Sequence, residues 1–432
     1  MRVLLVSTNR CDFMVPPFPL GLAFVAAGLD GRGHEVDVWD AMFEEDWASS
    51  LRQRLRDFRP HVVGLSVRNV DDQDIRSPRF LLEETRDMVS VCREESDATL
   101  VAGGPGFSMF ASEALSYLGV EYGIVGEGES AFPRLLEALA DRGALDRVPG
   151  LVWRQDGRVR QSPPELIPQL DDLPHADRQR LDSARYYASR GTASIPNAAT
   201  VQTKRGCSLS CVYCSTPAIE GRTLRLRSPD RVSDEVEALA EEGQTRVHFI
   251  DSVFTNPKEH AQAICQELVR RRLGVRWSCT LNPAFCSADL VRLMKRAGCG
   301  LVMVGNESGC DRQLDALRKG FSKRDVERCF EVLEGEGVPY NAFLLLGGPG
   351  EDRESIDESV ELMRNWAPSQ VSVTVGIRLY PGCELTGIAE AQGLLPARAD
   401  LLTPRFYLAP AIRDWIFDYL TPVVAENPTW VL

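Results

Sequence analysis

The sequence predicts an α/β protein: a doubly wound parallel sheet, then a partial (β/α)6 barrel and a small C-terminal cap. Short apolar runs alternate with amphipathic stretches along most of the 432 residues, which is typical of βαβ units. A polar, proline-containing stretch interrupts this alternation near the middle of the chain. A chain of this length also exceeds the size at which one hydrophobic core usually stops growing. We therefore expect two domains.

The first series of apolar runs lies within residues 1–145 and predicts the first domain. In chain order the runs are "RVLLVS", "HEVDVWD", "HVVGLSV", "ATLVAGG" and "EYGIVGEG", each followed by a helical pattern. Parallel sheets of this kind bind ligands beyond the carboxyl ends of their strands. The unusual segments "TNRCD", "RNVDDQD", "GGPG" and "GEGE" all follow apolar runs. The sequence therefore predicts a ligand site at this edge of the sheet.

Residues 146–197 are predicted to form a hairpin and a linker. In "GLVWRQDGRVRQ", Asp156 and Gly157 join two β-rich runs, and this dipeptide is a strong hairpin signal. Six further apolar runs within residues 198–384 predict the barrel: "ATVQTK", "RVHFID", "GVRWSCT", "CGLVMVG", "PYNAFLLLG" and "QVSVTVG". The aromatic, proline-rich stretch 385–432 is expected to pack on the barrel as a cap.

Composition excludes several classes of function. The net charge of −13 argues against a general nucleic-acid binder, which needs clustered Lys and Arg to neutralise phosphates. No apolar run approaches the roughly 20 residues of a membrane span, and the opening "MRVLLVSTNR" is too short for a signal peptide. We expect a soluble, cytoplasmic protein with neither nucleic-acid nor membrane partners. Its twelve cysteines should then be thiols, ligands or core residues.

Three cysteines stand apart from the other nine, which are scattered singly. Cys207, Cys211 and Cys214 lie together in "GCSLSCVYC". A structural zinc site would need a fourth Cys or His nearby, and none of the five histidines is close in sequence. Three ligands with one open corner suit a cubane iron–sulfur cluster whose fourth iron coordinates something else. The spacing favours the cluster over zinc.

The cysteine spacing, Tyr213 before the third cysteine and the position after the first barrel strand resemble the radical S-adenosylmethionine (SAM) superfamily. The resemblance implies a 4Fe-4S cluster held by Cys207, Cys211 and Cys214, which would be both metal ligands and catalytic residues. It implies that the open iron binds the amino and carboxylate groups of SAM. One electron would then cleave the sulfonium and release a 5′-deoxyadenosyl radical.

Three further segments match places where this superfamily contacts SAM. The segments are "FIDSVFT", "VGNESG" and "LLLGGPGED", at the ends of the second, fourth and fifth predicted barrel strands. The residues implied as SAM contacts are Tyr213, Asp251, Ser252, Glu307, Ser308, Gly347, Gly348 and Pro349. One departure concerns the third strand. Many relatives have a basic residue there, whereas this chain has Asn282, which we include among the cofactor contacts.

The first domain resembles the cobalamin-binding domain of a large class of radical SAM enzymes. The segments "PFPLGLAFVAAGLDGRGHEV", "GLSVRN", "VAGGPG" and "VGEGE" carry the resemblance, and the GxGxxG dinucleotide fingerprint is absent after the first strand. The residues implied as cobalamin contacts are Thr8, Ser66, Arg68, Asn69, Gly103, Gly104, Pro105, Gly126, Glu127 and Gly128. Side chains at the four glycines would collide with the corrin and its nucleotide tail. Ordinary tight turns are the alternative explanation of these glycines.

The group beneath the cobalt is the least usual feature of this site. The loop "STNRCDFMVPPF" contains no histidine, so we expect cobalamin to bind with its own base displaced and without a replacement histidine. Ser66, Arg68 and Asn69 are expected beneath the metal. A guanidinium stays protonated and cannot coordinate cobalt, which would favour its lower-coordinate states. The alternative for Arg68 is an ion pair with Asp71, Asp72 or Asp74.

The resemblance implies methyl transfer from SAM through methylcobalamin to an unactivated carbon, after hydrogen abstraction by the deoxyadenosyl radical. Ring contraction, cyclisation or another rearrangement with the same cofactors is the alternative. Methylthio transfer is disfavoured because it normally needs a second cluster, and a non-catalytic corrinoid carrier or light sensor by the intact SAM motifs.

Partners and substrate contacts are expected as follows. The substrate is a small molecule or carrier-bound intermediate of secondary metabolism, and a flavodoxin or ferredoxin supplies electrons. Tyr380, predicted as a catalytic residue, is expected to face the substrate together with Arg378 and Tyr407. Core packing is the alternative for Tyr380.

Overall fold

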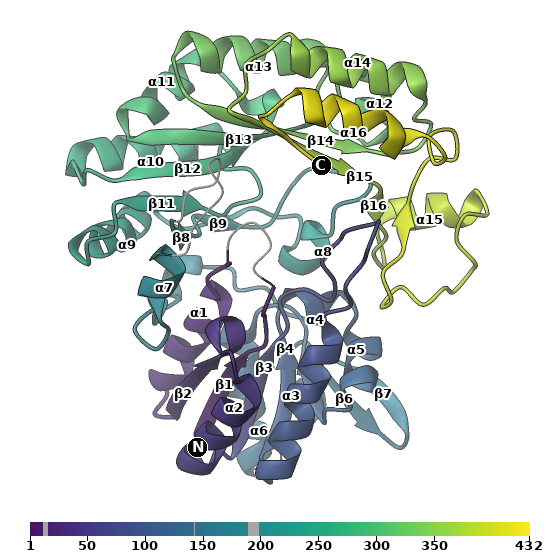
Figure 1. Ribbon diagram of the computed structural model, residues 1–432. Coiled ribbons are helices and arrows are strands. Elements are labelled where there is room, and N and C mark those ends of the chain that lie inside the picture. Colours follow the sequence, from purple (N-terminus) through teal and green to yellow (C-terminus); the bar gives the residue numbers. More distant parts are fainter. Residues whose placement is uncertain (12–15, 142, 189–197) are drawn as a thin grey trace. The chain divides into compact units, whose positions relative to one another are not determined.

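The computed structural model describes residues 1–11, 16–141, 143–188 and 198–432 (Figure 1). The chain divides into two compact units. The N-terminal unit comprises Met1–Arg190, Ala218–Glu220 and Asp400–Pro404, and the C-terminal unit comprises Gly191–Pro217, Gly221–Ala399 and Arg405–Leu432. Each unit is built on its own seven-stranded sheet, which confirms the predicted α/β class with a parallel sheet in each half. None of the helices described has the length and apolar character needed to span a bilayer.

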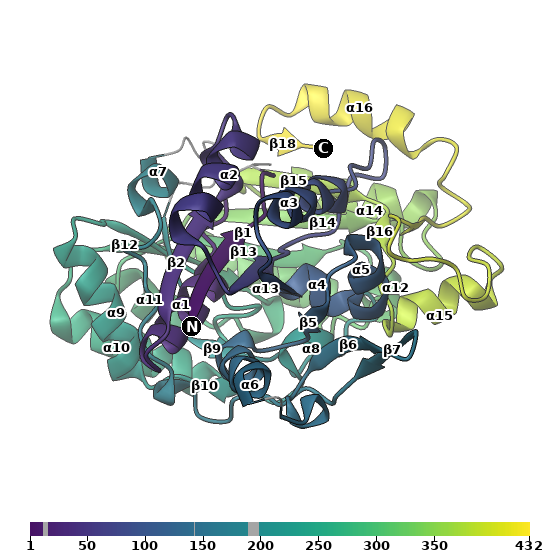
Figure 2. The same cartoon turned by 90° about the horizontal axis from the view of Figure 1, so that it is seen from below.

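The sheet of the N-terminal unit has the strand order β2-β1-β3-β4-β5-β6-β7. The strands are β1 (Arg2–Ser7), β2 (Glu35–Asp40), β3 (Val62–Ser66), β4 (Thr99–Gly103), β5 (Tyr122–Ile124), β6 (Leu151–Gln155) and β7 (Arg158–Gln161). The first five are parallel, and Figures 1 and 2 show β1 and β2 side by side. The hairpin around Asp156-Gly157 adds β6 and β7 antiparallel to β5 and to each other.

Helices follow the parallel strands as expected for βαβ units. They are α1 (Leu20–Asp30), η1 (Ala41–Phe43), α2 (Trp47–Phe58), α3 (Leu82–Glu95), α4 (Pro105–Met109), α5 (Ala111–Leu118), α6 (Gly128–Asp141), η2 (Leu145–Arg147), η3 (Leu170–Asp172) and α7 (Ser183–Ala188). Helix α1 packs against α6, whereas α2 packs against α3. Strand side chains such as Leu5 are buried with Phe24 and Phe132 of these helices. The carboxyl ends of the strands carry the loops with the predicted ligand residues.

The sheet of the C-terminal unit is wholly parallel, in the order β18-β15-β14-β13-β12-β11-β8. Its strands are β8 (Ala199–Val201), β11 (Arg246–Phe249), β12 (Arg276–Leu281), β13 (Cys299–Glu307), β14 (Tyr340–Leu346), β15 (Gln370–Val375) and β18 (Trp430–Val431). The first six correspond to the six predicted apolar runs. The end of the chain, expected only as a cap, also supplies β18, which pairs with β15 and buries Trp430. This pairing occupies an edge that β15 would otherwise leave open.

Helices connect these strands, and those that follow β12, β13 and β14 lie along one face of the sheet (Figure 1). The helices and short ladders are β9 (Lys204–Arg205), α8 (Thr216–Glu220), β10 (Arg225–Leu226), α9 (Pro229–Glu241), α10 (Lys258–Arg271), η4 (Pro283–Phe285), α11 (Ala288–Arg296), α12 (Asp311–Ala316), α13 (Lys323–Gly335), α14 (Arg353–Arg364), β16 (Ile377–Arg378), α15 (Glu384–Ala391), β17 (Phe406–Tyr407) and α16 (Ile416–Glu426). Strand β9 pairs with β10, and β16 with β17. These ladders lie beyond the sheet and shape the loops that follow β8 and β15.

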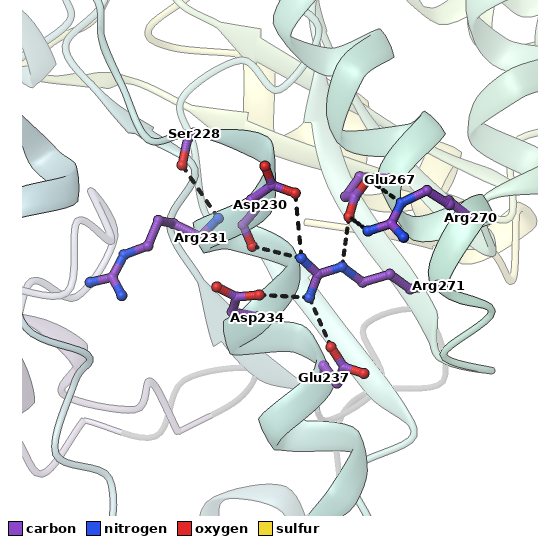
Figure 3. Close-up of polar contacts among 8 residues, drawn as sticks. All are labelled: Ser228, Asp230, Arg231, Asp234, Glu237, Glu267, Arg270 and Arg271. Atoms are coloured by element: carbon purple, nitrogen blue, oxygen red, sulfur yellow. Dashed lines mark hydrogen bonds and ion pairs between the residues drawn. The ribbon is translucent and has the colours of Figure 1, made fainter.

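Helices α9 and α10 are joined by an ion network centred on Arg271 (Figure 3). The Arg271 guanidinium is 12% exposed and pairs with Asp234 at 2.7 Å and Glu237 at 2.8 Å. It also pairs with Glu267 at 2.7 Å and Asp230 at 3.5 Å. Hydrogen bonding, chiefly to Glu267, raises the pKa of Arg271. Hydrogen bonds from Arg270 and Arg271 lower the pKa of Glu267 to about 2. One cation thus fixes the packing of two helices that border the first barrel strands.

Replacing Arg271 with Met is expected to lower the urea midpoint of unfolding, because four carboxylates lose their shared cation. The cost is about 1 kcal/mol after screening by solvent. The matched control is Arg270→Met, since the neighbouring Arg270 is 67% exposed and binds only Glu267 within this network. Equal midpoints for the two variants would contradict this account of the network.

Candidate functional site

The cysteine loop leaves the barrel after β8 and is closed at its base by the β9–β10 ladder. Gly206, directly before the first cysteine, has φ +94°, and a Cβ there would lie 2.3 Å from Thr223 O. The next residue, Cys207, donates its backbone N–H to Gly221 O at 3.1 Å. Only glycine fits at this position, where the backbone passes close to Thr223 O with a positive φ. Sequence reasoning missed Gly206, although a glycine adjoining the first cysteine was a visible signal.

Asp251 anchors the start of the same loop. Its carboxylate accepts hydrogen bonds from Thr203 N at 2.8 Å, Thr203 Oγ1 at 2.6 Å and Lys204 N at 3.2 Å, and it pairs with Lys204 Nζ at 3.5 Å. Burial lowers the pKa of Lys204, and Asp251 opposes that shift. Both carboxylate oxygens therefore hold the chain entering the cysteine loop. Ser252, the next predicted SAM contact, is only partly buried just beyond β11.

The three predicted cluster ligands lie in one loop, and none of them forms a disulfide. Cys207 is buried, whereas Cys211 and Cys214 are partly exposed. Burial raises the pKa of the Cys211 thiol, and Lys319 opposes this shift while Cys214 and Cys207 add to it. In the described part of the chain no three His, Cys, Asp or Glu side chains converge as ligands of one metal ion. In a cubane each thiolate binds a different iron, so three thiols in one loop beside a cation fit such a cluster.

Beside the thiols, three side chains form a buried polar group that we call the Lys319 triad: Lys319, Glu307 and Tyr213. Lys319 Nζ lies 3.0 Å from Glu307 Oε1 and 3.1 Å from the Tyr213 hydroxyl, which donates to Glu307 Oε1 at 3.2 Å. The Lys319 side chain is only 6% exposed. Burial opposes its charge, but Glu307 and Cys211 outweigh burial and raise the pKa of Lys319. Sequence reasoning missed Lys319, whose only signal was its position 12 residues after Glu307.

Glu307 and Ser308, predicted as a pair, point to different places. Glu307 has φ +60° at a register shift between β13 and β14, which turns its carboxylate toward Tyr213. The Ser308 hydroxyl lies 3.0 Å from Ser359 Oγ of α14 and accepts a hydrogen bond from Cys310 N at 3.1 Å. Of this predicted pair, the structure therefore brings Glu307 to Tyr213 of the cysteine loop, whereas Ser308 binds α14.

The glycine-rich turn after β14 is held from within by Glu351. Its carboxylate accepts the N–H groups of Gly347 and, at 2.9 Å, Gly348. Burial raises the pKa of Glu351 to about 7, although both hydrogen bonds oppose this shift. Gln313 of α12 donates to Pro349 O at 3.3 Å and so ties the turn to the helix that precedes Lys319. The predicted residues Gly347, Gly348 and Pro349 thus form one braced turn.

The remaining predicted residues of the C-terminal unit have different environments. Asn282 is buried and accepts a hydrogen bond from Ala284 N at 2.9 Å, so it caps the short helix η4. Tyr380 is partly exposed, with the Arg378 guanidinium 5.3 Å from its ring centre. Arg378 and Tyr407 are both buried, and the Tyr407 hydroxyl donates to Gln392 Oε1 at 2.7 Å. Of the three expected substrate contacts, only Tyr380 retains an accessible side chain.

In the N-terminal unit, polar side chains gather at the ends of β1 and β3. Thr8 Oγ1 donates to Ser66 O at 3.0 Å and accepts a hydrogen bond from Thr85 Oγ1 at 3.2 Å. Thr8 is buried, whereas Ser66 is partly exposed beside it. Arg68 is exposed, and its Nη1 donates to the Asn69 amide oxygen at 3.0 Å when that amide is oriented to satisfy both groups. Thr8 thus holds the two strand ends together, and Arg68 projects beyond them.

The rival ion pair for Arg68 is not formed. Asp71 accepts from Gln73 N at 3.0 Å, Asp72 from Asp74 N at 3.2 Å, and Asp74 from Arg76 N at 2.8 Å. No salt bridge joins Arg68 to these carboxylates in the part of the chain that the structure describes. The Arg68 guanidinium instead contacts the Asn69 amide, just beyond the end of β3.

The glycines of this edge divide into two groups. Gly104 has φ +95°, and a Cβ there would lie 2.6 Å from Val67 O, so the turn into α4 explains it without a ligand. A Cβ at Gly103 or Gly126 would meet nothing closer than 3.6 Å, and at Gly128 only Val25 at 3.2 Å. The nearby Pro105 begins α4, and Glu127 accepts from Ile167 N at 2.6 Å. Gly103 and Gly126, which we call the open glycines, thus keep a Cβ position at ordinary van der Waals distance from its neighbours, and Gly126 has φ +85°, so the turn itself favours glycine there.

Two family profiles match the chain. The profile of the Radical SAM superfamily matches residues 201–363, and that of the B12 binding domain matches residues 15–136. The first span contains the three cysteines and the Lys319 triad. The second contains the strand ends with Ser66, Arg68 and the open glycines.

Several known proteins are similar over most of their length. The tryptophan 2-C-methyltransferase of Streptomyces laurentii is 28% identical over 88% of this chain and 73% of its own length. An uncharacterized methyltransferase of Pyrococcus horikoshii is 27% identical over 87% of this chain and 79% of its own. The solved structure of the radical SAM methyltransferase TsrM from Kitasatospora setae, with cobalamin and a [4Fe-4S] cluster bound, is 25% identical. It covers 100% of this chain and 92% of its own, with a TM-score of 0.88.

Gly206→Ala is expected to prevent assembly of the cysteine loop, because the new methyl group would clash with Thr223 O. The readout is iron and sulfide bound per chain after anaerobic reconstitution, expected to fall at least about tenfold given the backbone strain. Gly274→Ala is the matched control, since Gly274 also has a positive φ, +69°, but open space around its Cβ position. Full iron loading of Gly206→Ala would refute the argument.

Glu351 should make stability depend on pH. Its folded pKa of about 7 lies above the ordinary 4.5, so the folded state holds an extra proton between these values. Stability should therefore fall as pH rises from about 4.5 to about 7, by up to about 3 kcal/mol, and remain lower above that window. Glu351→Gln should flatten the dependence of the urea midpoint on pH, whereas Glu354→Gln, at an exposed position, should not. An unchanged slope in Glu351→Gln would contradict the assignment.

Proposed function

We propose that this chain, which matches the Radical SAM profile over residues 201–363 and the B12 binding domain profile over residues 15–136, transfers a methyl group from SAM through cobalamin to a carbon atom of a small molecule. The observation that carries the proposal is the free-thiol loop beside the Lys319 triad, in a chain whose other half presents Arg68 at the strand ends. Both relatives and the solved structure described above are named as methyltransferases. They do not favour ring contraction or cyclisation.

The cofactor chemistry can be stated briefly. When bound, the cluster would supply the electron that cleaves SAM, and cobalamin would carry the methyl group to the substrate carbon. The chain's own residues hold and orient these groups. Cys207, Cys211 and Cys214 would bind three irons, and the loop keeps them in register because Asp251 and Gly206 fix its entry.

The residues that would receive SAM come from the Lys319 triad and from the turn after β14. Glu307 presents a carboxylate next to the Tyr213 hydroxyl, a polar pair suited to the ribose hydroxyls. Asn282 is a neutral amide that caps η4, so Lys319 would be the cation that balances the SAM carboxylate. The turn at Gly347 and Gly348 would approach adenine through its backbone. Glu351 fixes the shape of that turn.

In the N-terminal unit, Arg68 and the open glycines are the groups that would meet cobalamin. A guanidinium stays protonated and has no lone pair for a metal, so Arg68 would hold cobalamin without coordinating its cobalt. Gly103 and Gly126 would let the corrin nucleotide tail approach the backbone because they carry no side chain. Ser66, Asn69, Gly128 and Glu127 border the same strand ends.

The proposal extends to the substrate class, the electron donor and the cellular compartment. The substrate is a small or carrier-bound molecule, and Tyr380 is the residue we expect to touch it. A flavodoxin or ferredoxin would deliver the electron. The protein would work in the cytoplasm, where reducing conditions keep its cysteines as thiols.

The test is anaerobic reconstitution with iron, sulfide and cobalamin, followed by SAM labelled with deuterium in its methyl group and a low-potential reductant. We expect mass spectrometry to find the label on cobalamin. Tryptophan is the first acceptor to add, because it is the named substrate of a relative. Cys214→Ala is the negative control for SAM cleavage. Formation of 5′-deoxyadenosine without labelled cobalamin would overturn methyl transfer and favour rearrangement.

Arg68→His tests the proposed place of Arg68 with a spectroscopic readout. An imidazole at that position would offer cobalt a nitrogen lone pair that the guanidinium lacks. The electron paramagnetic resonance spectrum of bound cob(II)alamin should show nitrogen superhyperfine splitting in the variant and none in the wild type. Arg79→His, at an exposed position outside the strand ends, is the control. Identical spectra for Arg68→His and wild type would place Arg68 away from the cobalt.

A further inference from the structure

Strand β13 ends in a bulge directly before Glu307. Between the last two paired positions of β13 and β14, Gly305 and Asn306 together oppose the single residue Phe343. Ser308 N then donates to Asn306 O at 2.7 Å, which closes a three-residue turn around Glu307, whose φ is +60°. A β-bulge adds one residue to a strand and changes the direction of the side chains beside it. The bulge thus decides where the Glu307 carboxylate points.

The Asn306 side chain completes this bulge. A bulge interrupts the ladder and leaves a backbone group without its strand partner. Here Asn306 Oδ1 accepts the Phe343 N–H at 3.1 Å. Asn306 is wholly buried, so water does not compete for this acceptor, and an unpaired buried N–H would be costly. The irregular backbone before Glu307 therefore depends on one buried amide oxygen.

On the other side of Glu307, Ser359 of α14 holds the chain. Ser359 Oγ accepts the Gly309 N–H at 2.9 Å and lies 3.0 Å from Ser308 Oγ. The same hydroxyl donates to Ser355 O at 2.9 Å within α14. A Cβ at Gly309 would lie 2.9 Å from Ser359 Cα, so the chain here passes directly against the helix. Ser308 and Ser359 are wholly buried, so Glu307 is fixed from both sides by buried hydrogen bonds.

We propose that Asn306 and Ser359 are positioning residues for Glu307 and thereby determine how tightly the protein binds SAM. A residue other than glycine adopts a positive φ only where its surroundings impose it. In this conformation Glu307 Oε1 lies 3.2 Å from the Tyr213 hydroxyl and 3.0 Å from Lys319 Nζ. The two residues act through Glu307 and not on SAM itself. The inference rests on the proposed function, because it takes Glu307 as a SAM contact.

The test is the dissociation constant of SAM, measured by equilibrium dialysis with the reconstituted protein under anaerobic conditions and without reductant, so that SAM is not cleaved. Asn306→Leu keeps the size of the side chain but offers no acceptor. It should raise the constant about tenfold, as for the loss of one hydrogen bond to a charged group. Iron and sulfide per chain should stay at the wild-type value. Asn306→Asp retains an acceptor oxygen and should bind SAM more tightly than Asn306→Leu.

A double-mutant cycle separates positioning from a general loss of stability. In a Glu307→Ala background, Asn306→Leu should change the SAM dissociation constant by less than about twofold, because the residue that it positions is already absent. An equal loss of affinity in both backgrounds would show a merely structural role and overturn the proposal. So would wild-type affinity in Asn306→Leu.

A second variant covers the case in which Asn306→Leu does not fold. Ser359→Ala removes the hydroxyl on the other side of Glu307, keeps a good helix former in α14, and should behave in the same way in the cycle. Its matched control is Ser233→Ala, because Ser233 is equally buried in α9 and should leave SAM affinity unchanged.

Failure of this inference is distinguishable from failure of the proposed function. Wild-type SAM affinity in Glu307→Ala would overturn the inference, because Glu307 would then not be a SAM contact. Deuterium label on cobalamin in the wild-type protein would still support methyl transfer in that case.

Discussion

The charge balance around three cysteine thiols is the constraint on which the site of the C-terminal unit depends. A chain that keeps Cys207, Cys211 and Cys214 close together concentrates groups that become negative on binding metal. Lys319 places a buried positive charge in the same part of the unit. Glu307 forms an ion pair with it, and the Tyr213 hydroxyl accepts a hydrogen bond from it. Glu307 reaches this position only because the register of β13 shifts against β14 and its φ becomes positive. The irregular strand end is thus a requirement of the site.

Helix α12 links the parts of this site that lie far apart in sequence. It follows directly after the β13 end that carries Glu307, and Lys319 follows directly after it. Its Gln313 side chain binds the turn after β14 through Pro349 O. Because one short helix contacts both the triad and the glycine turn, the groups expected around SAM are positioned together. Asp251 has the corresponding role just after β11, where it fixes the entry to the cysteine loop.

The sequence was sufficient for the fold class and the six parallel strands of the second sheet, because apolar periodicity is a local signal. It was insufficient where side chains that are distant in sequence meet in the fold. Nothing in the sequence singled out Lys319, which the structure places beside Glu307, and the contact of Ser308 with Ser359 was not foreseen. Tyr407 and Arg378 were expected at the substrate but are buried in contacts of their own. The strand β18 was missed because two residues at a chain end carry no periodic pattern.

The central claim is that the three-thiol loop holds a cluster whose open iron receives SAM. Electron–nuclear double resonance of the reduced protein, with SAM labelled by 15N in its amino group and 17O in its carboxylate, tests this most directly. The account predicts hyperfine coupling of both labels to the cluster, because three cysteines leave one iron free. A reduced cluster that shows neither coupling when saturated with SAM would contradict it.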